Sequence, residues 1–240
     1  MSNLLETKYY RVTLNAKTAL LMHKDNIEFS ESISMWRKDA QNRKISVSGD
    51  DRSPAWTWIG YCYSDRTYGK IILDSDNIMT MLRNAGAKMP TGKGKQTYKT
   101  ITQCGLQVVG NFFKFYNNDE EISTDWINTL IGNNDFTEHQ KAVEEHGFIL
   151  NIKRAKIGSG AKASKHVRVR PQFNDWAAIG IVQVNDEETS GIKQDVLQRL
   201  FDIAGDVIGI GDWRPSSPSS GTFGRFKAIV EPCEDPKNID

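Results

Sequence analysis

Cysteine and histidine are both scarce in this chain of 240 residues, which has three cysteines and four histidines. Cys62, Cys104 and Cys233 are far apart and odd in number. They form no CxxC pair and no zinc spacing, so neither a disulfide framework nor a zinc finger is expected. The histidines are equally scattered. We therefore predict a reduced protein with ordinary thiols, no metal site and no other cofactor.

Long apolar runs are also missing. No stretch approaches the roughly 20 apolar residues that a membrane-spanning helix needs, and residues 1–7 carry no apolar leader. We predict from this a cytoplasmic protein without a membrane partner. The Gly-Lys-Gly-Lys sequence at residues 92–95 is not a phosphate-binding P-loop, because the GxxxxGK[ST] spacing is missing.

Net charge is only +1, so the chain as a whole has no electrostatic preference for an acidic partner. The charges are nevertheless segregated, since residues 85–118 and residues 146–174 contain no acid. A neutral chain with such segments can present a basic face. The basic residues of the two segments are Lys88, Lys93, Lys95, Lys99 and Lys114, and Lys153, Arg154, Lys156, Lys162, Lys165, Arg168 and Arg170.

These acid-free segments have the composition of loops that follow a nucleic-acid backbone. Lysines among glycines can track a flexible phosphate chain, and each contact releases counterions. Nearby aromatics such as Tyr98, Phe112 and Phe173 could stack on bases. The alternative is a pair of solvated loops beside core aromatics. Five of the six tryptophans, Trp36, Trp56, Trp58, Trp126 and Trp176, are expected to be core or interface anchors instead.

Residues 209–226 combine glycines and arginines in one turn near the C-terminus. Glycines at this density let backbone N–H groups approach an anion, and the arginine fork suits phosphate. The alternative is a surface loop whose glycines serve turn geometry alone. The residues of the predicted phosphate-binding loop are Gly209, Gly211, Arg214, Gly224 and Arg225.

The hydrophobic pattern predicts an α+β protein with a ferredoxin-like (RRM-like) βαββαβ core. Strands are expected at residues 9–14, 54–63, 68–73, 106–116, 148–155, 167–173, 176–184 and 223–230, and helices at 30–42, 77–84 and 192–204. We expect one domain, with its core in about 8–85 and 167–231. A large middle insertion, about 86–166, would carry the basic loops. Within it, residues 119–145 have the composition of a polar surface segment that exposes His139.

The two ends of the chain resemble the RAMP superfamily of CRISPR-associated proteins, and more narrowly its guide-RNA-binding backbone subunits. Members carry a C-terminal loop of the form GxG, then Arg, then GxGR, which is matched here by Gly209, Gly211, Arg214, Gly221, Gly224 and Arg225. The second half reads Gly-Thr-Phe-Gly, which is wider than GxG. The strand, turn and helix around residues 72–83 and the sequence Leu20-Leu21-Met22-His23 are also similar. The same features are also compatible with a phage-encoded relative of this family.

This resemblance implies a non-catalytic RNA-binding backbone subunit of a class 1 effector complex, active in antiviral defence. Its partners would be single-stranded guide RNA, target nucleic acid, copies of itself and other effector subunits. Two alternatives stay open: a phage single-stranded-DNA-binding or annealing protein, and a RAMP-type metal-independent endoribonuclease. The nuclease would use His23, which stands where RNA-cleaving relatives hold a histidine. Asp25 is better explained as a turn residue.

Overall fold

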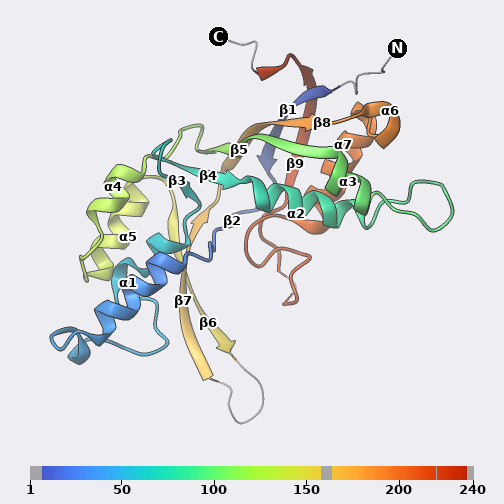
Figure 1. Cartoon of the computed structure of the whole chain (residues 1–240). Helices are drawn as coiled ribbons and strands as arrows, with labels where there is room; N and C mark the ends of the chain where they lie inside the picture. The colour runs from blue at the N-terminus through green and yellow to red at the C-terminus, as the bar shows by residue number, and fades with distance from the viewer. Residues whose placement is uncertain (1–6, 158–163, 220, 237–240) are drawn as a thin grey trace. The chain divides into compact units, whose positions relative to one another are not determined.

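The computed structural model of the chain describes residues 7–157, 164–219 and 221–236. Helices and antiparallel sheets make up the fold, as expected for the α+β class (Figure 1). The chain divides into two compact units. The first comprises Met1–Leu20, Ile72–Glu121 and Asn174–Asp240, and the second comprises Leu21–Ile71 and Ile122–Phe173. Among the helices of the described residues, none has the length and apolar character needed to span a membrane.

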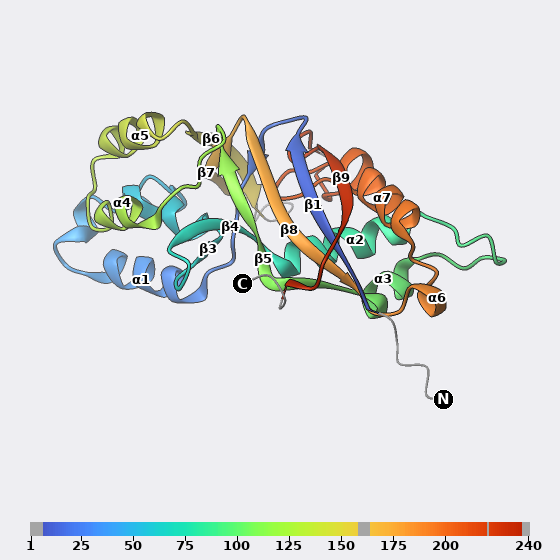
Figure 2. The ribbon, with the colours of Figure 1, turned by 90° about the horizontal axis from the view of Figure 1, so that it is seen from above.

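The first unit is built on an antiparallel sheet. Its elements are β1 (Lys8–Ala16), the end of β4 (Lys70–Asp74), α2 (Ser75–Gly86), α3 (Lys99–Gly105), β5 (Leu106–Asn117), β8 (Trp176–Val184), α6 (Glu187–Ser190), α7 (Gln194–Ile203), a π-helical turn (Ala204–Ile208) and β9 (Phe226–Cys233). The strands lie in the order β4-β5-β8-β1-β9. Figure 2 shows β5, β8, β1 and β9 side by side.

Helices α2 and α7 cover one face of this sheet (Figures 1 and 2). Alternate residues of β1 are buried, including Val12 and Leu14, as the two-residue period of a strand requires. Helix α7 is amphipathic, and its buried residues Leu197, Leu200 and Phe201 follow the helical period. The core of the first unit therefore forms between the buried side chains of the sheet and the buried side chains of the helices that cover it.

Strand β9, the last in the order, is bonded along its outer edge by side chains of α7. The Gln198 amide nitrogen donates to the Ala228 carbonyl oxygen (3.0 Å), and its amide oxygen accepts from the Val230 N–H (3.0 Å). The Gln194 amide nitrogen donates to the Val230 carbonyl oxygen (3.0 Å). Glutamine side chains thus supply hydrogen bonds that a further strand would otherwise make.

The second unit combines short helices with a small sheet. Its elements are β2 (Leu20–Leu21), at the boundary between the units, α1 (Ile27–Lys38), 3₁₀ helices at Asn42–Lys44 and Ala55–Tyr61, β3 (Ser64–Asp65), α4 (Thr124–Thr129), α5 (Phe136–Glu145), β6 (Ile149–Ile157) and β7 (Ser164–Phe173). In the sheet, β7 lies between β2 and β6. The core contains Trp58, Phe148 and Phe173, with ring centroids 6.1 Å apart in the first pair and 4.7 Å apart in the second.

The strand expected at residues 54–63 is wrong, because a 3₁₀ helix occupies Ala55–Tyr61. Every residue from Ala55 to Gly60 is buried. A run that is buried on all sides has no diagnostic period, so its apolar composition fits a compact helix as well as a strand. Trp56, Trp58 and Trp176 are buried, as expected for core anchors.

The two units divide the chain differently from the expected core and insertion. Residues 86–121 belong to the first unit, since β5 pairs with β8 in the middle of its sheet. Residues 122–166 belong to the second unit, together with residues 21–71. The segment 119–145 also carries helices α4 and α5, whose buried residues include Ile127 and Val143.

His139 is buried, so its expected place on the surface is wrong. Its Nδ1 accepts a hydrogen bond from the Trp58 indole N–H (3.0 Å), and its Nε2 lies 3.0 Å from the Asn133 carbonyl oxygen. An indole nitrogen only donates, so Nδ1 is unprotonated and Nε2 carries the hydrogen. Burial lowers the pKa of His139 below its ordinary value of 6.5. The imidazole is therefore a neutral core group.

This histidine should make the second unit less stable in acid. Below pH 6.5 the unfolded chain takes up a proton that the native imidazole refuses, so the free energy of unfolding falls as pH falls. One such group contributes a slope of at most about 1.4 kcal/mol per pH unit. Urea unfolding from pH 7.5 to pH 5 measures it. We expect His139→Gln to be less stable at pH 7.5 but to lose less stability on acidification.

Equal acid slopes for the wild type and His139→Gln would contradict this interpretation.

Candidate nucleic-acid interface

Strands β6 and β7 form a two-stranded basic ribbon in the second unit. They pair antiparallel from Ile149 opposite Gln172 to Ile157 opposite Ser164. Lys153 stands opposite Arg168, and Lys156 stands opposite Lys165. Directly opposite residues share a face and successive residues alternate, so Lys153 and Arg168 lie on one face and Arg154 and Lys165 lie on the other. The ribbon is therefore basic on both faces. Figure 1 shows it extending from the rest of its unit.

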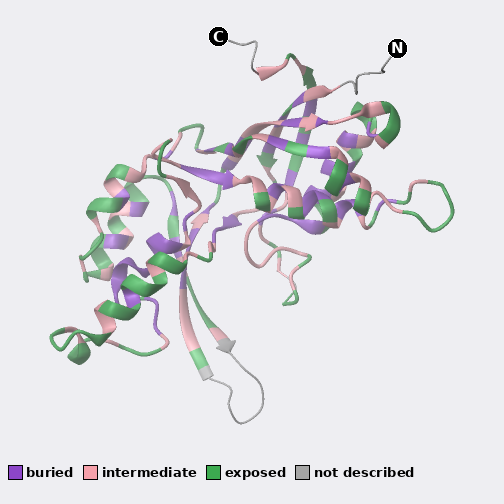
Figure 3. Cartoon of the chain, viewed as in Figure 1, coloured by how far each residue is buried: buried purple, intermediate pink, exposed green. Residues whose placement is uncertain are grey.

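Several of these charges are exposed. Lys153, Arg154 and Lys165 are exposed, and the side chain of Arg168 is 26% exposed. Figure 3 shows exposed residues along this part of β6. Lys156 is placed only by its backbone in β6, and Lys162 lies outside the described residues. The sequence predicted these residues as one group, and the strand pairing brings the described ones together.

Asp51 fixes the inner part of the ribbon. Its buried carboxylate accepts hydrogen bonds from Arg168 Nη1 (3.1 Å), the Val169 N–H (3.2 Å) and the Tyr61 hydroxyl (3.0 Å). Burial, followed by the Asp51 charge, raises the pKa of Tyr61 to about 12, so its hydroxyl stays a donor at neutral pH. A buried carboxylate is tolerated when it is paired and hydrogen-bonded in this way.

The backbone around Asp51 is also attached to β7. The Asp51 N–H donates to the Val167 carbonyl oxygen (3.0 Å), and the Val167 N–H donates to the Gly49 carbonyl oxygen (2.8 Å). The segment before the buried 3₁₀ helix is thus held against the strand that carries Lys165 and Arg168. Sequence reasoning missed Asp51 and Tyr61, because nothing in their local pattern reveals a partner more than a hundred residues away.

The glycine-rich turn of the first unit is packed against itself. Gly224 has φ +70° and is buried, and its carbonyl oxygen accepts from the Ile210 N–H (2.9 Å). A Cβ on Gly224 would overlap the Ile210 carbonyl oxygen, and one on Gly221 would overlap the Trp213 carbonyl oxygen. At Gly209 a Cβ would come within 2.6 Å of Pro215. The close approach of the two arms of the turn accounts for these three glycines.

Gly211 differs from these three glycines in its surroundings. It has φ +79° and lines a crevice of about 30 Å³ together with Asn77, Asn84 and Arg214. Polar side chains of α2 and of the turn therefore surround Gly211.

The two arginines brace the turn. Arg214 Nη1 donates to the Gly211 carbonyl oxygen (2.8 Å), and its Nε donates to Ser216 Oγ (3.2 Å). Arg225 Nη1 donates to the Asp206 carbonyl oxygen. Both side chains are partly exposed. Each guanidinium therefore already has a structural contact.

Lys93, Lys95 and Lys99 lie elsewhere in the first unit. The first two are exposed on the loop between α2 and α3, and Lys99 begins α3. The loop is closed by a hydrogen bond from the Thr91 N–H to the Gln96 carbonyl oxygen (3.0 Å). Figure 1 shows this loop and the glycine-rich turn leaving the first unit in different directions. The predicted binding residues thus fall into three separate groups, two in the first unit and one in the second.

His23, the candidate base of the nuclease alternative, lies in the second unit beside Tyr61. The two rings meet edge to face with centroids 4.6 Å apart, and the Tyr63 hydroxyl donates to the His23 carbonyl oxygen (3.1 Å). Arg168 Nη1 is 3.4 Å from the Tyr61 hydroxyl. His23 and Arg168 therefore share a tyrosine neighbour. Asp25 is exposed and precedes Asn26, the residue that caps α1.

No protein-family model matches the chain, and no curated protein matches it either.

The packing of the glycine-rich turn predicts a large loss of stability in Gly224→Ala. A residue with a side chain at this left-handed φ costs about 1–2 kcal/mol, and the overlap with backbone adds about 1–3 kcal/mol. We expect the free energy of unfolding to fall by about 2–5 kcal/mol, the sum of these two effects. Chemical denaturation measures it.

Gly94→Ala is the matched control, because Gly94 has φ +62° but its Cβ would meet nothing within 4 Å. Gly94→Ala should show only the conformational cost. If both variants lose the same stability, packing does not explain Gly224.

Proposed function

We propose that this chain binds single-stranded RNA through the ribbon of β6 and β7, as a non-catalytic subunit. The single observation that supports this most strongly is the exposure of Lys153, Arg154 and Lys165 on two paired strands. The whole segment from residue 146 to residue 174 has no acid to repel a phosphate chain. At about 3.3 Å per residue, the nine residues of β6 extend over a length that several nucleotides can follow.

The role of the ribbon follows from its chemistry. Lysine and arginine side chains on both faces can contact phosphates without reading base edges. Binding should therefore be strongly salt-dependent and nearly independent of sequence. The glycine-rich turn has a smaller part in this proposal, since its arginines and three of its glycines serve its own packing. Lys93 and Lys95 provide a second basic segment in the first unit.

The first unit supports the finer proposal of a ferredoxin-like core. Its elements follow the order β1, α2, β5, β8, α7, β9, and four of its strands lie in the order β5-β8-β1-β9. A βαββαβ chain with its first and third strands in the middle of the sheet fits this arrangement. Such a core agrees with the proposed membership in the RAMP superfamily. The subunit would then line up with copies of itself and other effector subunits along a guide RNA.

Removing the exposed ribbon charges should flatten the salt dependence of binding. Each lost phosphate contact on a single strand reduces the slope of log K against log salt by about 0.7. The triple variant Lys153→Ala, Arg154→Ala, Lys165→Ala should thus lose about 2 units of slope. Fluorescence anisotropy with a labelled uridine oligonucleotide, measured between low and physiological salt, provides the slope.

The control carries the same change in net charge outside the ribbon: Lys193→Ala, Arg199→Ala, Lys227→Ala, all three being exposed residues of the first unit. This control variant should keep most of the wild-type slope of log K against log salt. If the ribbon variant keeps the wild-type slope, the RNA must bind elsewhere on the protein. Tighter binding to a DNA oligonucleotide than to RNA would favour the single-stranded-DNA-binding alternative.

The non-catalytic proposal predicts that His23→Ala binds RNA like the wild type. The substitution removes the edge contact with Tyr61 from a ring that is already partly exposed. Incubating labelled RNA with each protein in the presence of a chelator tests for cleavage. Metal-independent cleavage by the wild type that disappears in a folded His23→Ala protein would instead establish the endoribonuclease.

A further inference from the structure

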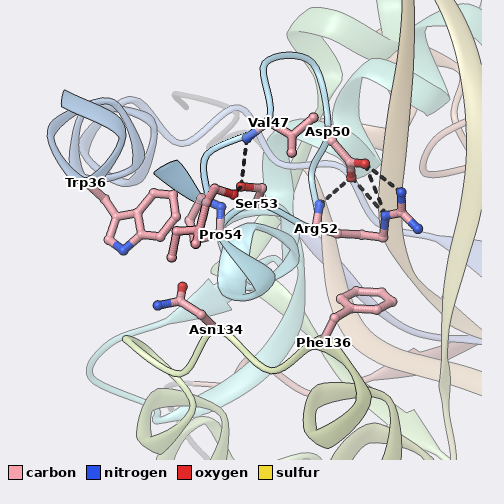
Figure 4. Close-up of a pocket in the computed structure, with 9 residues that line it drawn as sticks. Trp36, Val47, Asp50, Arg52, Ser53, Pro54, Asn134 and Phe136 are labelled. Carbon is pink, nitrogen blue, oxygen red and sulfur yellow. Dashed lines mark hydrogen bonds and ion pairs between the residues drawn. The ribbon is translucent and has the colours of Figure 1, made fainter. Parts of the chain in front are cut away.

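The second unit contains a pocket of about 360 Å³ beside the segment that is attached to β7. Its walls include Trp36 of α1 and Phe136 of α5, together with Val47, Arg52, Pro54 and Asn134. Figure 4 shows Trp36 and Phe136 on opposite sides of the hollow, with Asn134 between them. The volume is in the range of small-molecule sites. Trp36, expected as a core or interface anchor, therefore lines a surface cavity.

The rim of this pocket exposes apolar side chains. Ile45 is 55% exposed and Val47 is 54% exposed. Exposed aliphatic residues beside accessible aromatic rings and a proline form a surface that gains free energy when a flat apolar ligand covers it. The walls thus favour a planar partner over a hydrated ion.

The polar groups of the pocket restrict the ligand further. Arg52 is held by Asp50 in a two-point contact, with Nη2 2.6 Å from Oδ2 and Nε 3.0 Å from Oδ1. The bond from Arg52 is the main reason why the pKa of Asp50 is lowered. A guanidinium neutralised by its own carboxylate does not select an anion. The Asn134 amide offers both a donor and an acceptor.

An uncharged, planar ring with hydrogen-bonding groups on its edge satisfies all of these features. Nucleobases have this chemistry, and proteins recognise unstacked bases by aromatic stacking and by amide hydrogen bonds to the base edge. A phosphate would be repelled by the Asp50 carboxylate. A purely aliphatic chain would offer the Asn134 amide no hydrogen-bonding group.

The pocket is rigidly linked to the basic ribbon. Asp50 and Arg52, which line it, flank Asp51, whose carboxylate and N–H bind β7. Gly49, one residue before Asp50, accepts from the Val167 N–H. The segment that contributes Asp50 and Arg52 to the pocket is therefore the same segment that is bonded to β7.

We propose that this pocket receives one unstacked nucleobase of the single strand bound along β6 and β7. This inference rests on the proposed function, because it assigns the ribbon to the phosphates and the pocket to a base of the same strand. Base stacking on aromatic side chains should then strengthen binding by about fivefold to a hundredfold.

The test uses the full chain and three uridine oligonucleotides of equal length: one intact, one with a 2-aminopurine in the middle, and one with abasic sites throughout. The intact strand should bind at least fivefold more tightly than the abasic strand, since both keep the same phosphates. The 2-aminopurine fluorescence should change on binding to the wild type. Trp36→Ala and Phe136→Ala should remove both effects, while the ribbon contribution remains.

Two controls keep the result interpretable. Tyr116→Ala removes a partly exposed aromatic ring of the first unit and should leave the preference for the intact strand unchanged. Val47→Glu changes an exposed rim residue and should weaken the preference without unfolding the unit, which a melting curve verifies.

The outcomes separate the two proposals. Equal binding of the intact and abasic strands by the wild type, with the salt slope preserved, overturns the base pocket and leaves the ribbon proposal standing. Absence of binding to every strand overturns both. A Val47→Glu protein that loses self-association in sedimentation but keeps its preference for the intact strand assigns the pocket to a protein contact and overturns the proposal.

Discussion

The buried carboxylate of Asp51 is the group on which the basic surface of the second unit depends. It holds Arg168, the backbone of β7 and the Tyr61 hydroxyl at once. If the carboxylate lost these partners, a buried charge would remain uncompensated, which costs several kcal/mol. The ribbon, the tyrosine beside His23 and the segment that lines the aromatic pocket are therefore fixed by one side chain. The proposed nucleic-acid site would gain from such a rigid support.

The glycine-rich turn shows how one sequence pattern can serve two different requirements. A run of glycines and arginines can bind phosphate, but it can equally let two arms of a turn pass at backbone distance. Gly224 and Ile210 meet in the second way, and Arg225 is bonded to the backbone at Asp206. The atoms within 4 Å of each glycine show which of the two requirements it meets. These atoms belong to other parts of the chain, and composition alone does not reveal that they lie close together. The exposure of Lys153 and Arg154, by contrast, needs no distant partner, because both lie on a strand at the surface.

Elements with a clear period were predictable from the sequence. The expected strand at residues 176–184 matches β8, residues 106–116 lie within β5, and residues 148–155 and 167–173 correspond to β6 and β7. The expected helix at residues 192–204 contains α7. The basic charges of the ribbon could be grouped because they lie on consecutive strands. Asp51, Trp36 and Phe136 could not, because tertiary contacts alone bring them to the site. His139 was misjudged because a polar sequence around it hides the Trp58 indole that makes its burial tolerable.

The glutamines that bond the outer edge of β9 limit how copies of this chain can assemble. An incoming strand would have to displace Gln194 and Gln198 from Ala228 and Val230 before it could pair there. Continuous sheet growth from copy to copy is therefore disfavoured at this edge, which also protects the chain from amyloid-like stacking. Any contact that copies make at this edge would therefore have to be formed by side chains and not by backbone hydrogen bonds.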